Sequence, residues 1–478
     1  MKATHASLPR PSPEWFALSV LLLALWAGPL AGAAAELRVG VAAVDITPPA
    51  DMPLAGYYHA RAAEGTLDPL YCRALVLESG DTRVALVSLD LIEIPRAVTD
   101  AARAQIARDI ALPGDHVLVS ATHAHTGPVL AWPAQPTAIP GAAPPAALAY
   151  TTNLPARIAA AVRQALEHCA PARVSVARGR CDDLTFNRRY ILRDGSVGWN
   201  PGKLNPNLVR PAGPSDPEVG VLYVEKPDAT GPVGAMATWV NFAMHTDTTG
   251  GRRFSADWPG ALGRVLAGYH GPEHQTLVGL GACGNLNHLD FAWPWPQSGP
   301  AEQHRIATIL GAAVFQAYKR LQPLPAAPLR ARSVWVELDL PAVSESELAE
   351  ARHTLATVTN DAGGNFMKLV RAHRVMDLAA RNGRPHRVEV QAIAWGRELA
   401  WVGLPGEIFV ELGLALKQRS PFPHTFVVEL ANENVGYVPD RRSYLEGNYE
   451  PESARCAPGS GERLVEAAVR LLSELHAE

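Results

Sequence analysis

The chain has 478 residues, of which 47% are hydrophobic and 19% charged, enough to bury a large core. Its 43 basic and 47 acidic residues give a formal net charge of -4 with no basic patch, which argues against nucleic acid as a partner. Five cysteines are too few and too scattered for a disulfide scaffold or a zinc finger, and Cys169 with Cys181 is the pair that we expect to be bridged.

The first 35 residues have the pattern of a secretory signal peptide. A basic start precedes an apolar stretch at residues 16–26, and small residues at 33–35 form a cleavage site before Glu36. Because the run from 15 to 35 is almost long enough to span a bilayer, a retained single-pass anchor is the alternative, against which Pro29 and Gly32 argue. We expect cleavage near Ala35 and export of a single domain, residues 36–478, to the periplasm or the exterior.

Apolar runs predict strands along the whole mature chain. They cover residues 37–41, 74–77, 83–88, 116–121, 173–177, 219–224, 235–242, 275–280, 334–338, 388–394, 400–402 and 425–430. Amphipathic helices are predicted between them, at residues 101–110, 154–167, 303–321 and 463–475. Many of the runs are continuous rather than alternating, as in strands that are covered on both faces. The pattern predicts an α/β fold with a mixed β-sheet core covered by helices.

Two stretches rich in proline and tryptophan, residues 130–145 and 291–300, are predicted to be surface loops. Proline cannot join the interior of a sheet, and both stretches follow polar motifs. Their tryptophans Trp132, Trp293 and Trp295 either cap the edge of the core or form the rim of a substrate pocket.

The most informative motif is the sequence HAHTGP at residues 123–128, directly after a predicted strand. Strand side chains alternate with period two, so His123 and His125 are expected to point the same way from the end of the strand. Strand ends are where α/β proteins place their chemistry.

Three further predicted strands also end in polar residues. They lead to His245, to Glu407 at the start of a helical stretch, and to the segment 432–437, which ends in Tyr437. Zinc is often held by two imidazoles and a carboxylate, which leaves an open position for a reactive water. The alternative is that each is an ordinary hydrogen-bonded histidine or a glutamate at a helix start.

Short motifs follow one another in a fixed order from about residue 39 to the C-terminus. They are VDITPP (44–49), GY (56–57), DPLYCRALVL (68–77), SLD (88–90), ATHAHTGP (121–128), NR (187–188), His245, GNLN (284–287), LPGE (404–407), NVGY (434–437) and YE (449–450). Taken together, they resemble the catalytic domain of the neutral (non-lysosomal) ceramidases over nearly the whole mature chain.

The resemblance implies a zinc amidohydrolase, because these enzymes cleave the amide of ceramide to fatty acid and sphingosine. It implies four Zn²⁺ ligands, namely His123, His245, Glu407 and Tyr437. It assigns proton transfer to His125 and places Arg188 and Tyr449 around the scissile amide, where both could donate to a developing oxyanion.

The chain departs from the family pattern in two respects. Asn287 occupies the place of the serine in the motif G-D-x-S-P-N, and an amide cannot act as a nucleophile, although it can hydrogen-bond a tetrahedral intermediate. Cys283 is the only thiol in that loop, and a covalent route through it would need a lowered pKa and an adjacent base. The chain also ends soon after the last predicted helix, so the immunoglobulin-like C-terminal domain of the full-length enzymes is expected to be absent.

The sequence therefore predicts an exported zinc-dependent hydrolase of linear amides, with lipid amides such as ceramide as the first substrate class and metal-bound water as the nucleophile. A lipid substrate would also imply peripheral contact with a membrane. Two alternatives remain: a related esterase or N-acyl amidase, and a non-catalytic exported binding protein that has lost the family serine. The presence of His125, Arg188 and Tyr449 favours an enzyme.

Overall fold

The computed structural model describes residues 2, 37–50, 52–131 and 145–478. Residues Leu37–Glu478 form one compact unit. The predicted signal peptide, apart from Lys2, lies outside the described residues. So do residues 132–144 of the predicted loop at 130–145, with Trp132. Within the described part of the chain, no helix combines the length and the apolar character needed to cross a bilayer.

Three large sheets form within the described residues, and each is built in the same way. Three strands run antiparallel, and the last of them pairs in parallel with a fourth strand. In the first and second sheets, a fifth strand of two residues pairs antiparallel at the other edge. The first sheet contains β7 (Ala170–Pro171), β1 (Leu37–Asp45), β4 (Tyr71–Ser79), β5 (Thr82–Leu89) and β6 (Val117–Ala121). The second contains β17 (Gln322–Pro323), β8 (Arg173–Arg180), β13 (Glu218–Glu225), β14 (Ala235–Phe242) and β15 (Gln275–Leu280). The third contains β18 (Leu329–Leu338), β19 (His386–Trp395), β20 (Leu399–Gly403) and β22 (His424–Val428).

A helix connects the two parallel strands of each sheet, because a parallel neighbour cannot be reached through a tight turn. The crossover helices are α2 (Arg96–Ile110) in the first sheet, α4 (Asp257–His270) in the second and α8 (Val410–Arg419) in the third. The same antiparallel strands, crossover helix and parallel strand thus occur three times along the described part of the chain.

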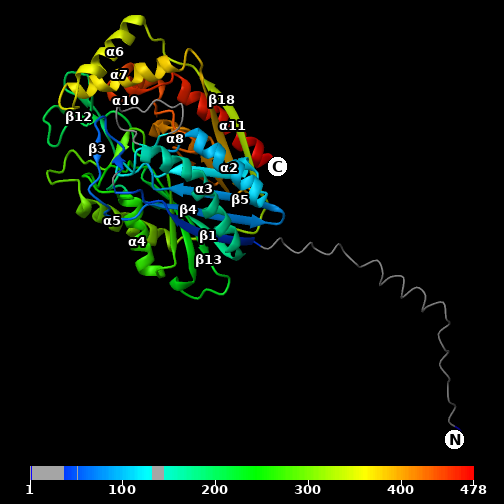
Figure 1. Ribbon diagram of the computed structural model, residues 1–478. Helices are drawn as coiled ribbons and strands as arrows, with labels where there is room; N and C mark the ends of the chain where they lie inside the picture. The colour runs from blue at the N-terminus through cyan, green and yellow to red at the C-terminus, as the bar shows by residue number, and fades with distance from the viewer. Residues whose placement is uncertain (1, 3–36, 51, 132–144) are drawn as a thin grey trace. The chain divides into compact units, whose positions relative to one another are not determined.

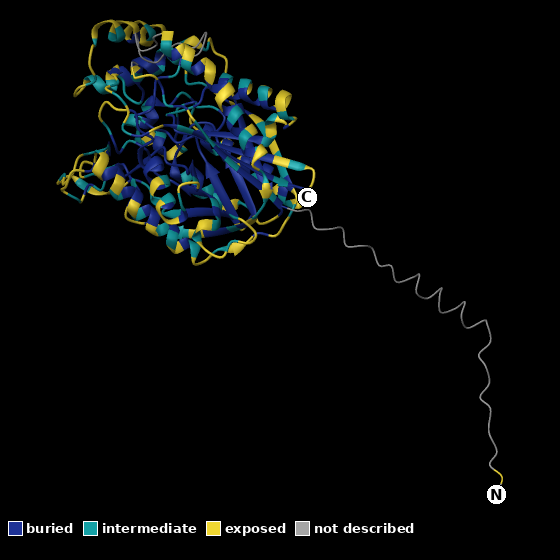
Figure 2. Ribbon diagram, turned by 60° about the horizontal axis from the view of Figure 1, so that its bottom comes forward, coloured by how far each residue is buried: buried dark blue, intermediate teal, exposed yellow. Residues whose placement is uncertain are grey.

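The inner faces of the three sheets share one hydrophobic core. It contains Trp239 of the second sheet and Trp395, Trp401 and Phe426 of the third, packed with leucines of the first sheet such as Leu118. Helices cover the outer faces (Figure 1), so that the central strands are buried on both sides (Figure 2). The covering helices are α2 with α3 (Pro145–Glu167), α4 with α5 (Pro300–Tyr318), and α8 with α11 (Ser460–Ala477).

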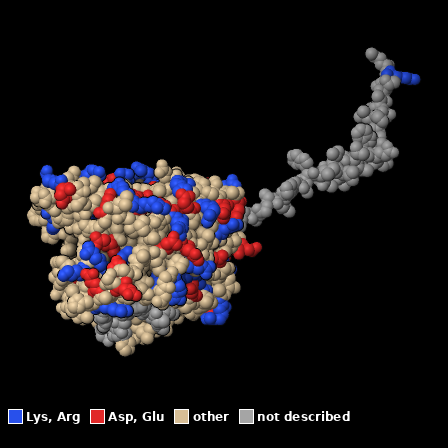
Figure 3. All heavy atoms as spheres, turned by 90° about the horizontal axis from the view of Figure 1, so that it is seen from above, with Lys and Arg blue, Asp and Glu red and all other residues tan. Residues whose placement is uncertain are grey.

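Shorter elements complete the described part of the fold. The strands are β2 (Pro53–Leu54), β3 (Arg61–Ala62), β9 (Phe186–Asn187), β10 (Arg189–Leu192), β11 (Val197–Trp199), β12 (Leu208–Pro211), β16 (Leu286–Asn287), β21 (Glu407–Ile408) and β23 (Tyr437–Val438). The helices are α6 (Glu345–Thr357), α7 (Asn365–Ala380), α9 (Arg441–Glu446) and α10 (Tyr449–Ser453). On the face shown in Figure 3, acidic and basic side chains are interspersed.

The predicted α/β class and the twelve predicted strands are confirmed, and the second-sheet strands 235–242 and 275–280 have the predicted bounds. The loop before α5 is also confirmed, with Trp295 65% exposed and Trp293 under the guanidinium of Arg305. The helix expected to begin at Glu407 is wrong, because Glu407 lies in β21 and α8 starts three residues later.

The expected disulfide between Cys169 and Cys181 is also wrong, since both cysteines are free. They flank β8, and an eight-residue strand holds its ends roughly 25 Å apart at about 3.3 Å per residue. A disulfide requires Cα atoms within about 7 Å.

Candidate metal and active site

The two histidines of the H-x-H motif lie beyond β6 rather than on it. The strand ends at Ala121, and His123 has a φ of 59°, in the left-handed region. The strand alternation expected to align the two imidazoles is therefore absent. A non-glycine residue in this region costs about 1–3 kcal/mol, and the loop is held by bonds such as that from the Ala124 amide to the Leu91 carbonyl, 3.0 Å. The loop still brings Nε2 of His125 to 3.2 Å from Nε2 of His123.

Glu407 and Tyr437 are placed side by side by a short parallel pairing. The two residues are direct partners in the register of β21 and β23. The approach depends on Gly406, which has a φ of 137° and where a Cβ atom would lie 2.7 Å from the carbonyl oxygen of Gly436. Any other residue would be strained at this φ and would push the two segments apart.

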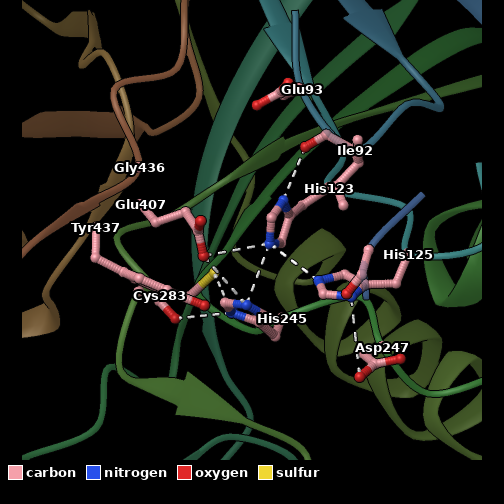
Figure 4. Close-up of polar contacts among 12 residues, drawn as sticks. Ile92, Glu93, His123, His125, His245, Asp247, Cys283, Glu407, Gly436 and Tyr437 are labelled. Atoms are coloured by element: carbon pink, nitrogen blue, oxygen red, sulfur yellow. Dashed lines mark hydrogen bonds and ion pairs between the residues drawn. The ribbon is translucent and has the colours of Figure 1, made fainter. Parts of the chain in front are cut away.

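His123, His245 and Glu407 converge from three separate parts of the chain (Figure 4). Nε2 of His123 lies 3.1 Å from Nε2 of His245, and each of these atoms is 3.4 Å from Oε2 of Glu407. With His125, the histidines form a group whose ligand atoms lie within 4.8 Å of one another, suited to holding a metal ion. Figure 4 also shows the side chain of Tyr437 directed toward this group.

Hydrogen bonds to backbone carbonyls fix the orientation of the three imidazoles. Nδ1 of His123 contacts the Ile92 carbonyl at 2.8 Å, Nδ1 of His245 contacts the Cys283 carbonyl at 3.1 Å, and Nδ1 of His125 contacts a third carbonyl at 3.1 Å. A carbonyl only accepts, so each Nδ1 carries a proton, and in the neutral form of each ring the Nε2 lone pair faces inward. Facing lone pairs repel unless a cation lies between them. Oε2 of Glu407 is buried without a hydrogen-bond partner in the described structure, so the donor set fits a divalent metal.

The charges of the site are strongly coupled. Burial lowers the pKa of His245 to about 3 and holds that of His125 well below its ordinary value. Although burial opposes the charged form, Glu407 raises the pKa of His123, and the two neighbouring imidazoles hold the pKa of Glu407 well below its usual range. The carboxylate is thus ionised, as a ligand to a cation must be.

Arg188 lies against the tyrosine side of the site. Its Nη2 donates to the hydroxyl of Tyr437 at 3.1 Å and to the Gly284 carbonyl at 2.6 Å, while Nε donates to Glu450 at 2.8 Å. The ring of Tyr449 lies 5.4 Å from that of Tyr437. Burial raises the pKa of both tyrosines well above the ordinary value, so both are hydrogen-bond donors at neutral pH.

Asn287 is held within its own loop. Its Nδ2 donates to Asn200 at 2.9 Å, and its Oδ1 accepts from the Leu289 amide at 3.1 Å. In the described structure no hydrogen bond joins it to the histidines, although the neighbouring Asn285 carbonyl accepts from the Arg188 amide. Among the described residues, only one of its two side-chain N–H groups has a hydrogen-bond partner.

Two acidic groups near the histidines were not predicted from the sequence. Asp247 accepts from the hydroxyl of Tyr57 at 2.8 Å and lies 4.0 Å from Nδ1 of His125. Glu429 is fully buried behind the Cys283 segment. Asp247 lies two residues after His245 in the sequence, and its partner Tyr57 belongs to one of the matched motifs. This closeness in sequence to other site residues could have indicated that Asp247 lies near the site. Glu429 had none, because a glutamate in an apolar run has no distinctive pattern.

Residues 37–202 match the family model described as neutral/alkaline non-lysosomal ceramidase, N-terminal. This part of the chain is similar to the N-terminal part of the neutral/alkaline ceramidases. The resemblance read from the sequence is confirmed by this match, which includes the H-x-H motif and Arg188.

Solved structures show that the fold is that of a neutral ceramidase. The crystal structure of neutral ceramidase from Pseudomonas aeruginosa matches with a TM-score of 0.69 at 19% identity, over 93% of this chain and 76% of that one. A structure described as ceramidase complexed with C2 matches with the same TM-score and coverage at 18% identity. No curated protein matches the chain.

Proposed function

We propose that this protein is an exported zinc-dependent hydrolase of linear N-acyl amides of the ceramide type. The family and the fold support a ceramide-type amide hydrolase. The observation that carries the proposal is the convergence of inward-facing Nε2 atoms on the unpaired carboxylate oxygen of Glu407. We assign the metal ligands to His123, His245, Glu407 and Tyr437.

Zinc bound there would lower the pKa of a water molecule and polarise the amide carbonyl. His125 is neutral at physiological pH, because burial lowers its pKa. Its Nε2 lies 3.2 Å from Nε2 of the proposed ligand His123. It can accept a proton from the attacking water and then deliver it to the leaving nitrogen. Arg188 and Tyr449 supply donors for the oxyanion, and Arg188 is held in place by its bonds to Glu450 and Gly284.

An apolar substrate fits the aromatic side chains next to Tyr449. The ring of Phe366 lies 5.1 Å from that of Tyr449 and is stacked on Trp199 at 5.1 Å with an interplanar angle of 3°. All three rings are partly exposed. Pockets for apolar ligands are built from such side chains around a few polar groups. These rings support a lipid-like acyl or alkyl arm.

A panel of fluorogenic substrates tests the proposal. The full chain, loaded with zinc, is assayed with N-acyl amides of short and long acyl length and with the matching esters. We expect chelator-sensitive amide hydrolysis that favours an apolar acyl arm. Turnover of esters alone would favour the esterase alternative, and binding without turnover of any substrate would favour the non-catalytic binding protein. Export is tested separately by the mass of the mature protein, which we expect to begin near Glu36.

A further inference from the structure

Glu429 lies behind the metal site, at the residue after β22, with no exposed surface. Its Oε2 accepts from the amides of Cys283 at 3.0 Å and Ile408 at 2.8 Å. Its Oε1 accepts from the Cys283 thiol at 2.8 Å. No basic side chain forms an ion pair with it among the described residues. These hydrogen bonds give both oxygens of the buried carboxyl group partners and fix its position.

The two amides bound by Glu429 belong to the segments that set the metal ligands. The Cys283 carbonyl accepts the Nδ1 proton of His245 at 3.1 Å, and so fixes the direction of that imidazole. Ile408 follows Glu407 directly, and its carbonyl accepts from the Gly284 amide at 2.9 Å. A single carboxylate therefore joins the segment that orients one ligand to the segment that carries another.

We infer that Glu429 is a positioning residue for the metal site, because it joins the Cys283 and Ile408 segments so that His245 and Glu407 meet at one point. The inference rests on the metal site of the proposed function. Groups that orient metal ligands affect metal affinity by about 10- to 100-fold when they are removed. Glutamine can place its carbonyl oxygen where Oε2 lies and still accept from both amides, whereas leucine has no acceptor and leaves both amides without this partner.

The test measures zinc affinity in the full chain by competition with a chromogenic chelator, using zinc alone as the probe. We expect Glu429→Leu to weaken zinc binding by about 10- to 100-fold, and Glu429→Gln to bind zinc nearly as tightly as the wild type. Glu429→Asp keeps a carboxyl group on a shorter side chain and should give a smaller loss than Glu429→Leu, which keeps the inference testable if Glu429→Leu does not fold. In the cobalt-substituted protein, the visible absorption bands of Glu429→Leu and Glu429→Asp should shift, since the ligand geometry changes.

Glu389→Leu is the matched control, with Glu389→Gln in its place if Glu389→Leu does not fold. Glu389 is also a buried glutamate and accepts from Arg96 and Arg103 at 2.6 and 2.7 Å, but it makes no contact with the histidines in the described structure. This variant should lower the unfolding temperature and leave zinc affinity and the cobalt spectrum unchanged.

Zinc affinity and cobalt bands in Glu429→Leu and Glu429→Asp that match the wild type would overturn the inference, as would an equal loss of affinity in the Glu389 control. Failure of the wild type to bind zinc would overturn the metal site and the inference together. Zinc binding without amide turnover would contradict the proposed activity alone, and the comparison of variants would still decide the role of Glu429.

Discussion

His125 lies nearly as close to His123 as His245 does, with Nε2–Nε2 distances of 3.2 and 3.1 Å. Its role as a proton-transfer residue rather than a metal ligand therefore needs a direct test. A further protein ligand would occupy the position that must receive water and substrate. We therefore expect His125→Ala to retain zinc and to lose activity by about a hundredfold or more, the loss expected when acid–base help is removed. Metal analysis and the rate of amide hydrolysis check this. Loss of zinc in this variant would show that His125 is a ligand.

Cys283 is unsuited to nucleophilic catalysis. Burial and the adjacent Glu429 raise the pKa of the thiol well above its ordinary value, and a thiol rather than a thiolate is a poor nucleophile. We expect Cys283→Ala to stay active and ¹⁸O from labelled water to enter the acid product without a burst. An acyl group trapped on Cys283, detected by mass spectrometry, would contradict direct attack by water.

Asn287 stands where the family has a serine, and its free N–H is suited to orienting a substrate or an oxyanion. We expect Asn287→Ala to lower kcat by about 10²- to 10³-fold, the range for loss of one oxyanion donor. Its hydrogen bond to Asn200 provides a control, because Asn200→Ala removes the partner but keeps the donor. If kcat of Asn287→Ala equals that of the wild type, the residue has no part in the reaction.

At the scale of helices and strands, the sequence predicted those elements that depend on a local pattern of residues. Buried strands such as β14 and β15 are apolar throughout, and the motifs at their ends mark the site. The pairing of β21 with β23, which aligns Glu407 with Tyr437, could not be predicted, because it joins residues thirty positions apart through backbone bonds. The left-handed φ of His123 was missed for a similar reason, since surrounding contacts impose it against the preference of the residue.

Glu433 links α2 to the third sheet and makes stability depend on pH. Its carboxylate accepts from the Glu389 amide and lies 3.7 Å from Arg96, yet burial raises its pKa from 4.5 to about 7. A group whose pKa is raised in the folded state contributes stability below pH 4.5, and this contribution is lost as the pH rises through about 7.

Glutamine does not titrate, so we expect Glu433→Gln to avoid this loss. The free energy of unfolding of the variant minus that of the wild type should be roughly 2 kcal/mol larger at pH 8 than at pH 5. Urea unfolding at the two pH values measures the difference. Glu345→Gln, at an exposed position of α6, should show no such gain. An equal pH response in wild type and Glu433→Gln would contradict the assignment.

For the whole molecule, the threefold repetition of strands and crossover helix explains how distant motifs form one site. His123 follows β6 of the first sheet, His245 follows β14 of the second, and Glu407 follows β20 of the third. Because the three sheets share one core, their ends are held in fixed positions before any metal binds. The fold class could be predicted from sequence, but not this repetition, since it is a property of strand pairing rather than of residue pattern.

The most direct test of the metal site is the zinc content of the purified full chain. It is measured by inductively coupled plasma mass spectrometry after the protein is loaded with zinc and desalted. We predict about one zinc per chain in the wild type and in His270→Ala, a histidine of α4 outside the cluster, and less than roughly a tenth of that in His245→Ala. A wild type without bound zinc, or a His245→Ala variant that retains it fully, would contradict the central claim.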